Sequence, residues 1–352
     1  MKQSDRSFII LYQRPGDKLE QKWRGCLTAS DFATHYTAPE YFLEPSLQSK
    51  RPFAVLSLTG EEVTGVLTGV HERKRVQSGL SVRPQIAFRR DVDRARTMDN
   101  LVDGLLAEAN RAKLVELFVW SDMTTLIESR SRQKACEGVV VLDLSRGPDT
   151  LFGKFSQNKR RNIIRAIECG VSVAGATRED EISEYYEVCV DWSRRKGLPI
   201  PKEERFENIF SLTGNRLLLL ARHQGEIIAG VVIRFAPHGV MEYAANSSLE
   251  NALRLRPNDL LHWRAIQWGC RQGMTKYSLG GTHLFLRKFG GQIVPTTRCR
   301  FDLSIFRGYT MHDWLAEKIE QARMFTPEVM FTVGRSLRCR MDVRISVGRD
   351  SA

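Results

Sequence analysis

The chain has 352 residues, and its 53 lysines and arginines outnumber its 41 aspartates and glutamates, so the formal net charge is +12. Hydrophobic residues make up 42% and charged residues 27%, which excludes a disordered tail protein, a collagen-like repeat and a small disulfide scaffold. The apolar runs fall far short of the ~20 residues that cross a bilayer. The first residues lead into no apolar stretch typical of a secretory signal. We therefore expect a cytoplasmic protein of two globular domains without a transmembrane segment.

The cysteines do not have the spacing of a metal site. They are odd in number and scattered, without a CxxC pair or a Cys/His cluster at zinc spacing. We expect reduced thiols in a reducing compartment and no bound metal. The seven cysteines stand at positions 26, 136, 169, 189, 270, 299 and 339.

The first half of the chain begins with the pattern of a β-hairpin. Residues 53–59 and 63–70 are rich in β-branched and aliphatic side chains, and Gly60 lies in the turn between them. The remaining elements are predicted from apolar periodicity. In chain order they are an extended stretch at 78–88, a helix at 98–111 and strands at 114–120 and 138–144.

A basic helix is predicted at 151–169, capped by Asp149 or Thr150 and ended by Gly170. Its apolar stripe consists of Phe152, Phe155, Ile163 and Ile167. Its cations Lys154, Arg161 and Arg165 share one face, with Lys159 and Arg160 beside them. A row of guanidinium groups suits phosphate recognition, and a solvated basic face is the alternative.

The second half repeats the element order of the first. We predict a hairpin of 217–222 and 227–235, a strand at 240–246, a helix at 258–271 capped by Asn258 or Asp259, and strands at 276–280 and 297–306. Hairpin, strand, helix, strand, strand therefore occurs twice, which predicts a tandem duplication of mixed α/β domains; a chance likeness of two such domains is the alternative. We place the domains at 1–148 and 149–310, and expect a helical, basic extension at 311–352 to pack on the second domain.

Candidate functional residues are densest between 243 and 291. A helix that begins near Asn258 presents free backbone N–H groups, and a phosphate bound there would have Arg254 and Arg256 alongside. Paired glycines allow the backbone to approach a ligand closely, at Gly280-Gly281 and again at Gly290-Gly291. Further candidates in this region are Tyr243, Asn246 and His283.

Four segments together resemble the Fem-type branch of the GNAT acyltransferase superfamily. They are 159–171 (KRRNIIRAIECGV), 257–273 (PNDLLHWRAIQWGCRQG), 277–281 (YSLGG) and 285–291 (FLRKFGG). The resemblance covers about 150–305 and implies tandem GNAT-like domains of the α/β class with a mixed sheet. It also implies transfer of an acyl or aminoacyl group to an amine, with aminoacyl-tRNA or acyl-CoA as co-substrate and no tightly bound cofactor. Fem enzymes attach amino acids to peptidoglycan precursors.

The chain departs from the Fem pattern at one informative position. The family usually has a lysine after the phenylalanine that matches Phe285, and this lysine is implicated at the reacting carbonyl. Leu286 stands there, followed by Arg287 and Lys288. We predict that Arg287, Lys288 or backbone N–H groups at Gly280-Gly281 stabilise the oxyanion and that His283 accepts the proton of the amine, unless this histidine is only hydrogen-bonded in a loop. Glu242 and Tyr243 are weaker candidates for proton transfer.

Charge and loop patterns do not decide whether acyl-CoA or aminoacyl-tRNA is the donor. The glycine-rich loop that commonly clamps acyl-CoA is missing before both helices, at 93–97 and 254–257. Basic stretches at 73–90, 154–165 and 335–349 suit tRNA, CoA and anionic lipid alike. The sequence predicts an N-acyltransferase whose acceptor, a small-molecule or lipid-linked amine of a cell-wall precursor or envelope sugar, lies between the domains. The alternatives are a non-catalytic tRNA-binding protein that keeps the GNAT fold, and a peripheral membrane adaptor.

Overall fold

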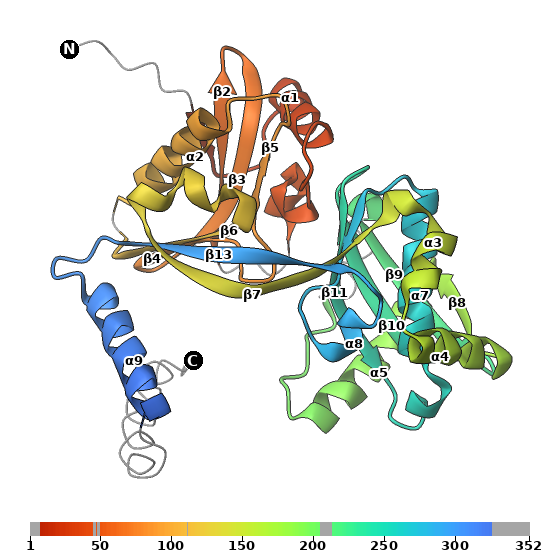
Figure 1. Cartoon of the computed structure of the whole chain (residues 1–352). Helices are drawn as coiled ribbons and strands as arrows, with labels where there is room; N and C mark the ends of the chain where they lie inside the picture. The colour runs from red at the N-terminus through yellow and green to blue at the C-terminus, as the bar shows by residue number, and fades with distance from the viewer. Residues whose placement is uncertain (1–7, 45–46, 48–49, 111, 205–212, 326–352) are drawn as a thin grey trace, which may run out of the picture. The chain divides into compact units, whose positions relative to one another are not determined.

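A computed structural model of the chain describes residues 8–44, 47, 50–110, 112–204 and 213–325 (Figure 1). The chain divides into two compact units, Met1–Phe301 and Asp302–Ala352. Among the described helices, none is both long and apolar enough to pass through a membrane. The six cysteines that the structure describes are all free.

The first half of the larger unit contains the predicted hairpin and the predicted strand at 114–120. Its helix begins earlier than the predicted residue 98, because Asp93 caps it by accepting a hydrogen bond from the backbone N–H of Arg96 at 3.1 Å. The extended stretch at 78–88 is interrupted by a turn, where Gly79 adopts φ +79°. The elements are β1 (Phe8–Leu11), α1 (Asp17–Thr28), β2 (Arg51–Thr59), β3 (Glu62–Glu72), β4 (Arg75–Ser78), β5 (Ile86–Phe88), α2 (Arg94–Glu108), β6 (Leu114–Trp120) and β7 (Arg132–Asp143).

The second half contains the predicted strands and the helix after 257, but the single helix predicted at 151–169 is wrong. The helix breaks at Phe155, and Ser156 caps a new helix by accepting from the backbone N–H of Lys159 at 3.3 Å. The predicted last strand begins at Gln292 rather than at 297. The elements are α3 (Pro148–Lys154), α4 (Gln157–Glu168), β8 (Ser172–Gly175), α5 (Glu179–Lys196), β9 (Arg216–His223), β10 (Glu226–Phe235), β11 (Val240–Ser248), α7 (Pro257–Arg271), β12 (Lys276–Ser278), α8 (Leu284–Arg287) and β13 (Gln292–Asp302).

One mixed sheet runs through both halves in the order β1-β2-β3-β4-β6-β13-β7-β12-β11-β10-β9-β8, with β5 paired to β3. The last strand, β13, lies between β6 and β7 of the first half, while the end of β7 pairs with β12 of the second. Because side chains alternate along a strand, Val139 and Val141 of β7 join the core of the first half, and Val140 and Leu142 join the core of the second. The two halves therefore share strands.

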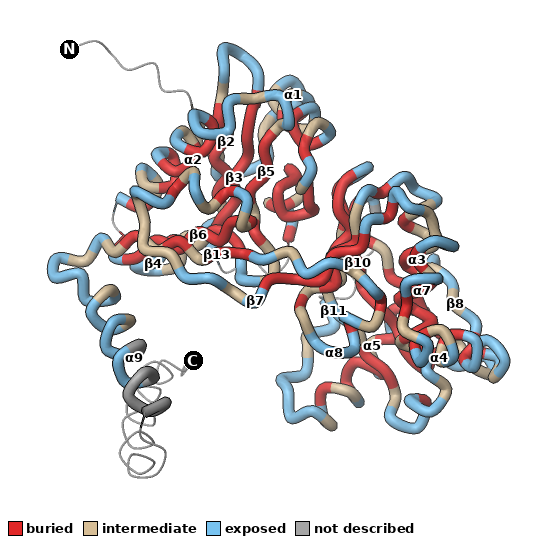
Figure 2. The backbone as a smooth tube through the Cα atoms, in the orientation of Figure 1, coloured by how far each residue is buried: buried red, intermediate tan, exposed pale blue. Residues whose placement is uncertain are grey.

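Helices cover both faces of the sheet in each half, and Figure 2 shows the buried residues concentrated on strands such as β2, β3 and β10. In the first half, α2 packs on one face and α1 on the other. In the second half, α4 and α7 cover one face, and α5 covers the other. Ile167, predicted to join the buried stripe of its helix, is 47% exposed.

The smaller unit contains α9 (Gly308–Phe325). Before it, the carboxylate of Asp302 accepts from the backbone N–H of Thr310 at 2.7 Å. The predicted packing of 311–352 on the second domain stays a prediction, and the arginines of 335–349 lie outside the described residues.

Candidate functional site

The strands β11 and β12 separate at the centre of the second half. In the described part of the chain they pair only where Val240–Glu242 faces Lys276–Ser278. Beyond this point β11 stays with β10 as far as Ser248. The chain after β12 stays with β7, since the backbone N–H of Leu279 donates to the carbonyl of Val140 at 2.9 Å. The segments 243–248 and 279–281 therefore diverge after the short β11–β12 ladder, and we call the place where they diverge the β11–β12 opening.

Several predicted site residues meet at this opening. The hydroxyl of Tyr243 donates to the side-chain oxygen of Asn246, and burial raises the pKa of Tyr243 to about 12, so this phenol is neutral. Gly280 has φ +73°, and a Cβ on it would lie 3.2 Å from the carbonyl oxygen of Tyr243. Asn258 lies beside the end of β11, because its side-chain amide lies 3.4 Å from the hydroxyl of Ser248. Gly281 is buried.

The three predicted catalytic side chains follow the opening along the chain. His283 is exposed just before α8, and a Cβ on Gly281 would lie 3.6 Å from its ring. Arg287 is exposed and donates from Nε to the carbonyl of Thr282 at 2.6 Å. Lys288 is half-buried. Leu286, at the position of the family lysine, is 5% exposed and belongs to the core.

The predicted cap of α7 is wrong, because Pro257 takes the first helical position and both candidate residues lie after it. The N-cap is Arg256 at φ 59°, and Asn258 and Asp259 lie inside the helix. The carboxylate of Asp259 pairs with the ammonium of Lys159 and accepts from Asn162 at 3.2 Å. This pair joins α4 to α7.

Lys159 does not belong to the predicted cationic face, because it is 2% exposed. Its Nζ lies 3.4 Å from the ring centre of Phe285 and 4.1 Å from that of Phe289. Burial lowers the pKa of Lys159, and Asp259 opposes that shift. Burial, together with the nearby charge of Lys159, lowers the pKa of His262 to about 3, so this imidazole is neutral.

The other predicted cations remain on the surface but are divided among several segments. Lys154 ends α3, whereas Arg161 and Arg165 are exposed on α4, so the predicted single helical face is wrong. Arg254 and Arg256 are exposed in the turn before α7. All five side chains are accessible to a polyanion.

Gly290 and Gly291 allow close packing of the chain, and the ligand approach predicted for them stays a prediction. Gly290 has φ +72°, and a Cβ on it would lie 2.5 Å from the carbonyl oxygen of Lys154. A Cβ on Gly291 would lie 2.7 Å from the carbonyl oxygen of Val141 on β7. These glycines therefore let the chain after α8 lie against α3 and β7.

A cavity of about 560 Å³ adjoins the same part of β11. Its walls are residues 243–247 of β11, Val232 of β10, and side chains of α5 that include Tyr185 and Trp192. Glu44, Arg216 and Arg234 also line it. Sequence reasoning did not single out these three residues.

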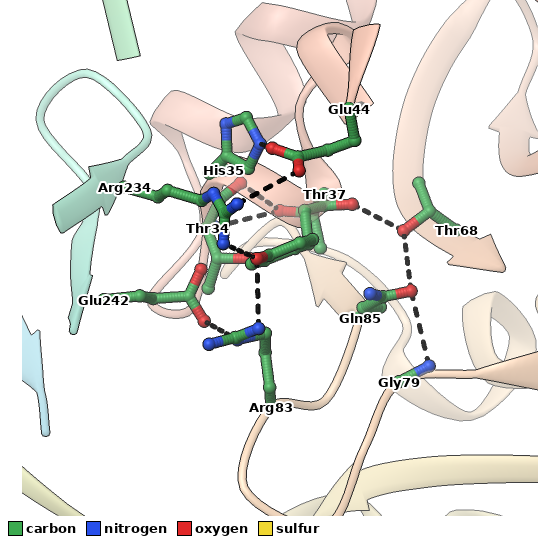
Figure 3. A network of polar contacts seen from close by, with 11 residues as sticks. Thr34, His35, Thr37, Glu44, Thr68, Gly79, Arg83, Gln85, Arg234 and Glu242 are labelled. Carbon is green, nitrogen blue, oxygen red and sulfur yellow. Dashed lines mark hydrogen bonds and ion pairs between the residues drawn. The ribbon is translucent and has the colours of Figure 1, made fainter. Parts of the chain in front are cut away.

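Glu44 and Arg234 belong to a cluster of polar contacts that connects the two halves (Figure 3), and Arg216 joins it through Glu44. Tyr36 accepts from Arg83 at 3.0 Å and from Arg234. Arg83 Nε lies 3.4 Å from a carboxylate oxygen of Glu242. Glu44 contacts His35 and Arg216, and its other oxygen lies 3.2 Å from Arg234 Nη2. We call these seven residues, namely His35, Tyr36, Glu44, Arg83, Arg216, Arg234 and Glu242, the charged cluster.

The two carboxyl groups of the charged cluster differ in their protonation. Burial alone would raise the pKa of Glu44, but the hydrogen bond from His35 and the charges of Arg234 and Arg216 hold it at about 2. Burial raises the pKa of Glu242 to about 7, against the opposing charges of Arg83 and Arg234. Glu242 is the last residue of β11 before the strands separate, so a group that can exchange a proton near neutral pH adjoins the opening.

Comparisons with known proteins agree with this geometry. Residues 153–285 match the family described as an acetyltransferase (GNAT) domain. This part of the chain is therefore similar in sequence to a GNAT acetyltransferase domain. It includes the opening, α7 and the first residues of α8, which confirms the predicted enzyme class, a transferase. No curated protein matches the chain.

Solved structures show that the likeness of fold extends over most of the chain. The crystal structure of FemX is 14% identical with a TM-score of 0.65, over 79% of this chain and 95% of that one. The C-terminal domain of a putative lysylphosphatidylglycerol synthetase from Agrobacterium fabrum is 12% identical with a TM-score of 0.53, over 72% and 85%. A tandem GNAT protein from the clavulanic acid biosynthesis pathway is 12% identical with a TM-score of 0.52, over 84% and 98%. The predicted fold, mixed α/β with tandem GNAT-like halves, is confirmed.

Proposed function

We propose that this protein is an N-acyltransferase that moves an acyl or aminoacyl group from acyl-CoA or aminoacyl-tRNA to a primary amine. The β11–β12 opening within the acetyltransferase domain carries this proposal, since it offers backbone groups of two strands to one bound molecule. The resemblance to Fem enzymes and the name of the lysylphosphatidylglycerol synthetase support an aminoacyl donor, and the name of the domain family supports an acyl donor. We propose a cell-wall precursor or an envelope sugar, free or lipid-linked, as acceptor, and the cytoplasm as the location.

The reaction requires a neutral amine, a place for the negative oxygen and a path for one proton. The amine nitrogen forms a bond to the carbonyl carbon, and the bond from that carbon to the sulfur of CoA or to the ribose oxygen of tRNA breaks. We assign the oxyanion to backbone N–H groups at Gly280-Gly281 or to the side chains of Arg287 or Lys288. His283 takes the proton of the amine, with Glu242 as the second candidate because its pKa lies at about 7. The leaving thiol or hydroxyl carries a proton away.

Donor binding is assigned to residues 149–310. The exposed cations Arg161, Arg165, Arg254 and Arg256 contact phosphates of the donor. Residues 1–148 contribute Tyr36, Glu44 and Arg83 to the charged cluster beside the cavity. The acceptor then enters through this cavity.

A non-catalytic tRNA-binding protein is the second candidate function. Leu286 favours it, because this buried side chain stands where the family lysine is implicated at the reacting carbonyl. Such a protein would retain tRNA affinity, and each lysine or arginine removed would weaken binding and make it less dependent on salt.

Turnover of the variants H283A and R287A separates the two functions. Acyl-CoA and aminoacyl-tRNA are each supplied with a panel of primary amines, and amide formation is followed by mass spectrometry. For a transferase we expect at least a tenfold loss of turnover with little change of melting temperature, because both side chains are exposed. The matched control R271A removes an exposed arginine at the end of α7. Amide formation that is absent with both donors, or unchanged in both variants, contradicts the assigned roles.

A further inference from the structure

The charged cluster contains more positive than negative side chains. Burial lowers the pKa of His35 and raises that of Tyr36, so both are neutral. Among the described residues of the cluster, three guanidinium groups then face two carboxyl groups, those of Glu44 and Glu242. Within these seven described residues, at least one positive charge is therefore uncompensated, and a buried charge without a partner is costly.

The two arginines that line the cavity also have spare hydrogen-bond donors. The Nε atoms of Arg216 and Arg234 are buried and have no hydrogen-bond partner within the part of the chain that the structure describes. The side chain of Arg216 is 2% exposed, so solvent does not satisfy it. One oxygen of the neighbouring Glu44 carboxylate contacts His35 and Arg216, and the other lies 3.2 Å from Arg234 Nη2 without a hydrogen-bond partner among the described residues. The excess of positive charge beside the cavity therefore favours a bound group that carries negative charge.

The rest of the cavity is suited to a small organic molecule. Its volume of about 560 Å³ lies within the ~300–1,000 Å³ that small-molecule sites usually have. Tyr185, Trp192 and Val232 supply apolar wall, against which a hydrocarbon or the face of a sugar packs. Residues 243–247, which also line it, border the β11–β12 opening. The strand register places Arg216 two strands from β11, which is about 10 Å across a sheet.

We propose that the cavity binds an acceptor that carries an acid group as well as its amine, and that Arg216 and Arg234 hold this carboxylate or phosphate. The amine of the same molecule then lies beside 243–247, where the acyl carbonyl arrives. This inference rests on the proposed function and narrows its acceptor to amphoteric amines. Glu242 completes the charge balance of the site, because a bound monoanion leaves the cluster neutral when this carboxyl is ionised.

The test is acceptor binding to the full chain without any donor, in two matched pairs that differ by the acid group. L-Lysine is compared with cadaverine, which lacks the carboxylate, and glucosamine 6-phosphate with glucosamine. Binding is measured by calorimetry and by the shift of melting temperature at constant ionic strength. In at least one pair the acid-bearing member should bind at least tenfold more tightly. A preference in the lysine pair indicates a site for a carboxylate, and a preference in the glucosamine pair indicates a site for a phosphate.

Two variants test the location of the acid group. R234Q should abolish the preference within the pair, whereas R222Q, the matched control on β9 whose arginine pairs with Glu181, should retain it. Because R234Q changes a residue of the charged cluster, A245F provides a second test that leaves the cluster unchanged. Its phenylalanine replaces an exposed alanine of β11 that lines the cavity, so it should fill the cavity and abolish binding. Equal binding within both pairs, or binding to A245F as in the natural protein, overturns the inference.

Turnover separates failure of the inference from failure of the proposed function. Acid-selective binding without amide formation from either donor would contradict the proposed function and leave the acid site standing. Amide formation at equal kcat/KM for the two members of each pair would overturn the acid site and leave the transferase standing.

Discussion

Replacing Glu242 by glutamine should make the protein progressively more stable than the natural chain as the pH rises. Burial holds the pKa of Glu242 at about 7 in the fold, against 4.5 for the free side chain. Below pH 4.5 the carboxyl is protonated in both the folded and the unfolded chain, so it contributes no difference. Between pH 4.5 and pH 7 the carboxyl is ionised in the unfolded chain but still mostly protonated in the folded one, so the free energy of unfolding falls as the pH rises. Above pH 7 the loss is complete.

The magnitude follows from the two pKa values. At about 1.4 kcal/mol per pH unit, a pKa raised from 4.5 to about 7 corresponds to about 3 kcal/mol of unfolding free energy. Glutamine has the same shape, does not titrate, and still offers an oxygen to Arg83. The free energy of unfolding of E242Q minus that of the natural chain should therefore rise by about this amount between pH 4.5 and pH 8.

The assay is urea unfolding of both chains at several pH values in this range. The control E226Q removes an exposed carboxylate at the start of β10 and should show no such trend. If E242Q instead becomes less stable than the natural chain as the pH rises, the arginines outweigh burial and the argument about Glu242 is wrong.

Three further substitutions test the packing around the site. K159M should lower the free energy of unfolding by about 3–5 kcal/mol, because it leaves the buried carboxylate of Asp259 without its cation. In thermal unfolding, K159M/D259N should recover most of that loss. If the effects of the two substitutions simply add, the pairing is contradicted. Because the pKa of His262 is lowered from 6.5 to about 3, the natural chain should lose about 3 kcal/mol from this group as the pH falls from 6.5 to 4.5. H262F should not show that part of the loss, and parallel pH curves would refute the assignment. G291A should cost about 1–3 kcal/mol in urea unfolding, since its methyl group would lie 2.7 Å from the carbonyl oxygen of Val141; an unchanged stability would show that β7 yields there.

The local elements of the fold could be predicted because their signals lie within short segments. The β-branched runs around Gly60 and the apolar strand at 114–120 each indicate their own structure. The break before α4 had a local signal as well, the capping residue Ser156, and the apolar periodicity of 151–169 obscured it. The placement of β13 between β6 and β7 has no such signal, because it depends on strands far apart in the sequence.

The residues of the candidate site also fall into those with a local sequence signal and those brought together only by the fold. The glycines and arginines around α7 form one stretch of sequence, so they could be singled out together. Lys159 looked like one more surface cation, since its partner Asp259 comes from a distant helix. The charged cluster is assembled from segments between 35 and 242. Its only local trace is a charged residue within an apolar strand, such as Arg234 in β10, and that pattern is unusual for a strand buried on both faces.

The central claim is that a donor binds in the β11–β12 opening, and hydrogen–deuterium exchange of the full chain tests it most directly. Exchange is compared with and without acetyl-CoA, and with and without an aminoacyl-tRNA. We predict that at least one of the two donors slows exchange in peptides covering 243–248 and 279–283, because the facing backbone groups of the separated strands become occupied. Slowed exchange confined to other segments, or no change with either donor, would contradict the claim.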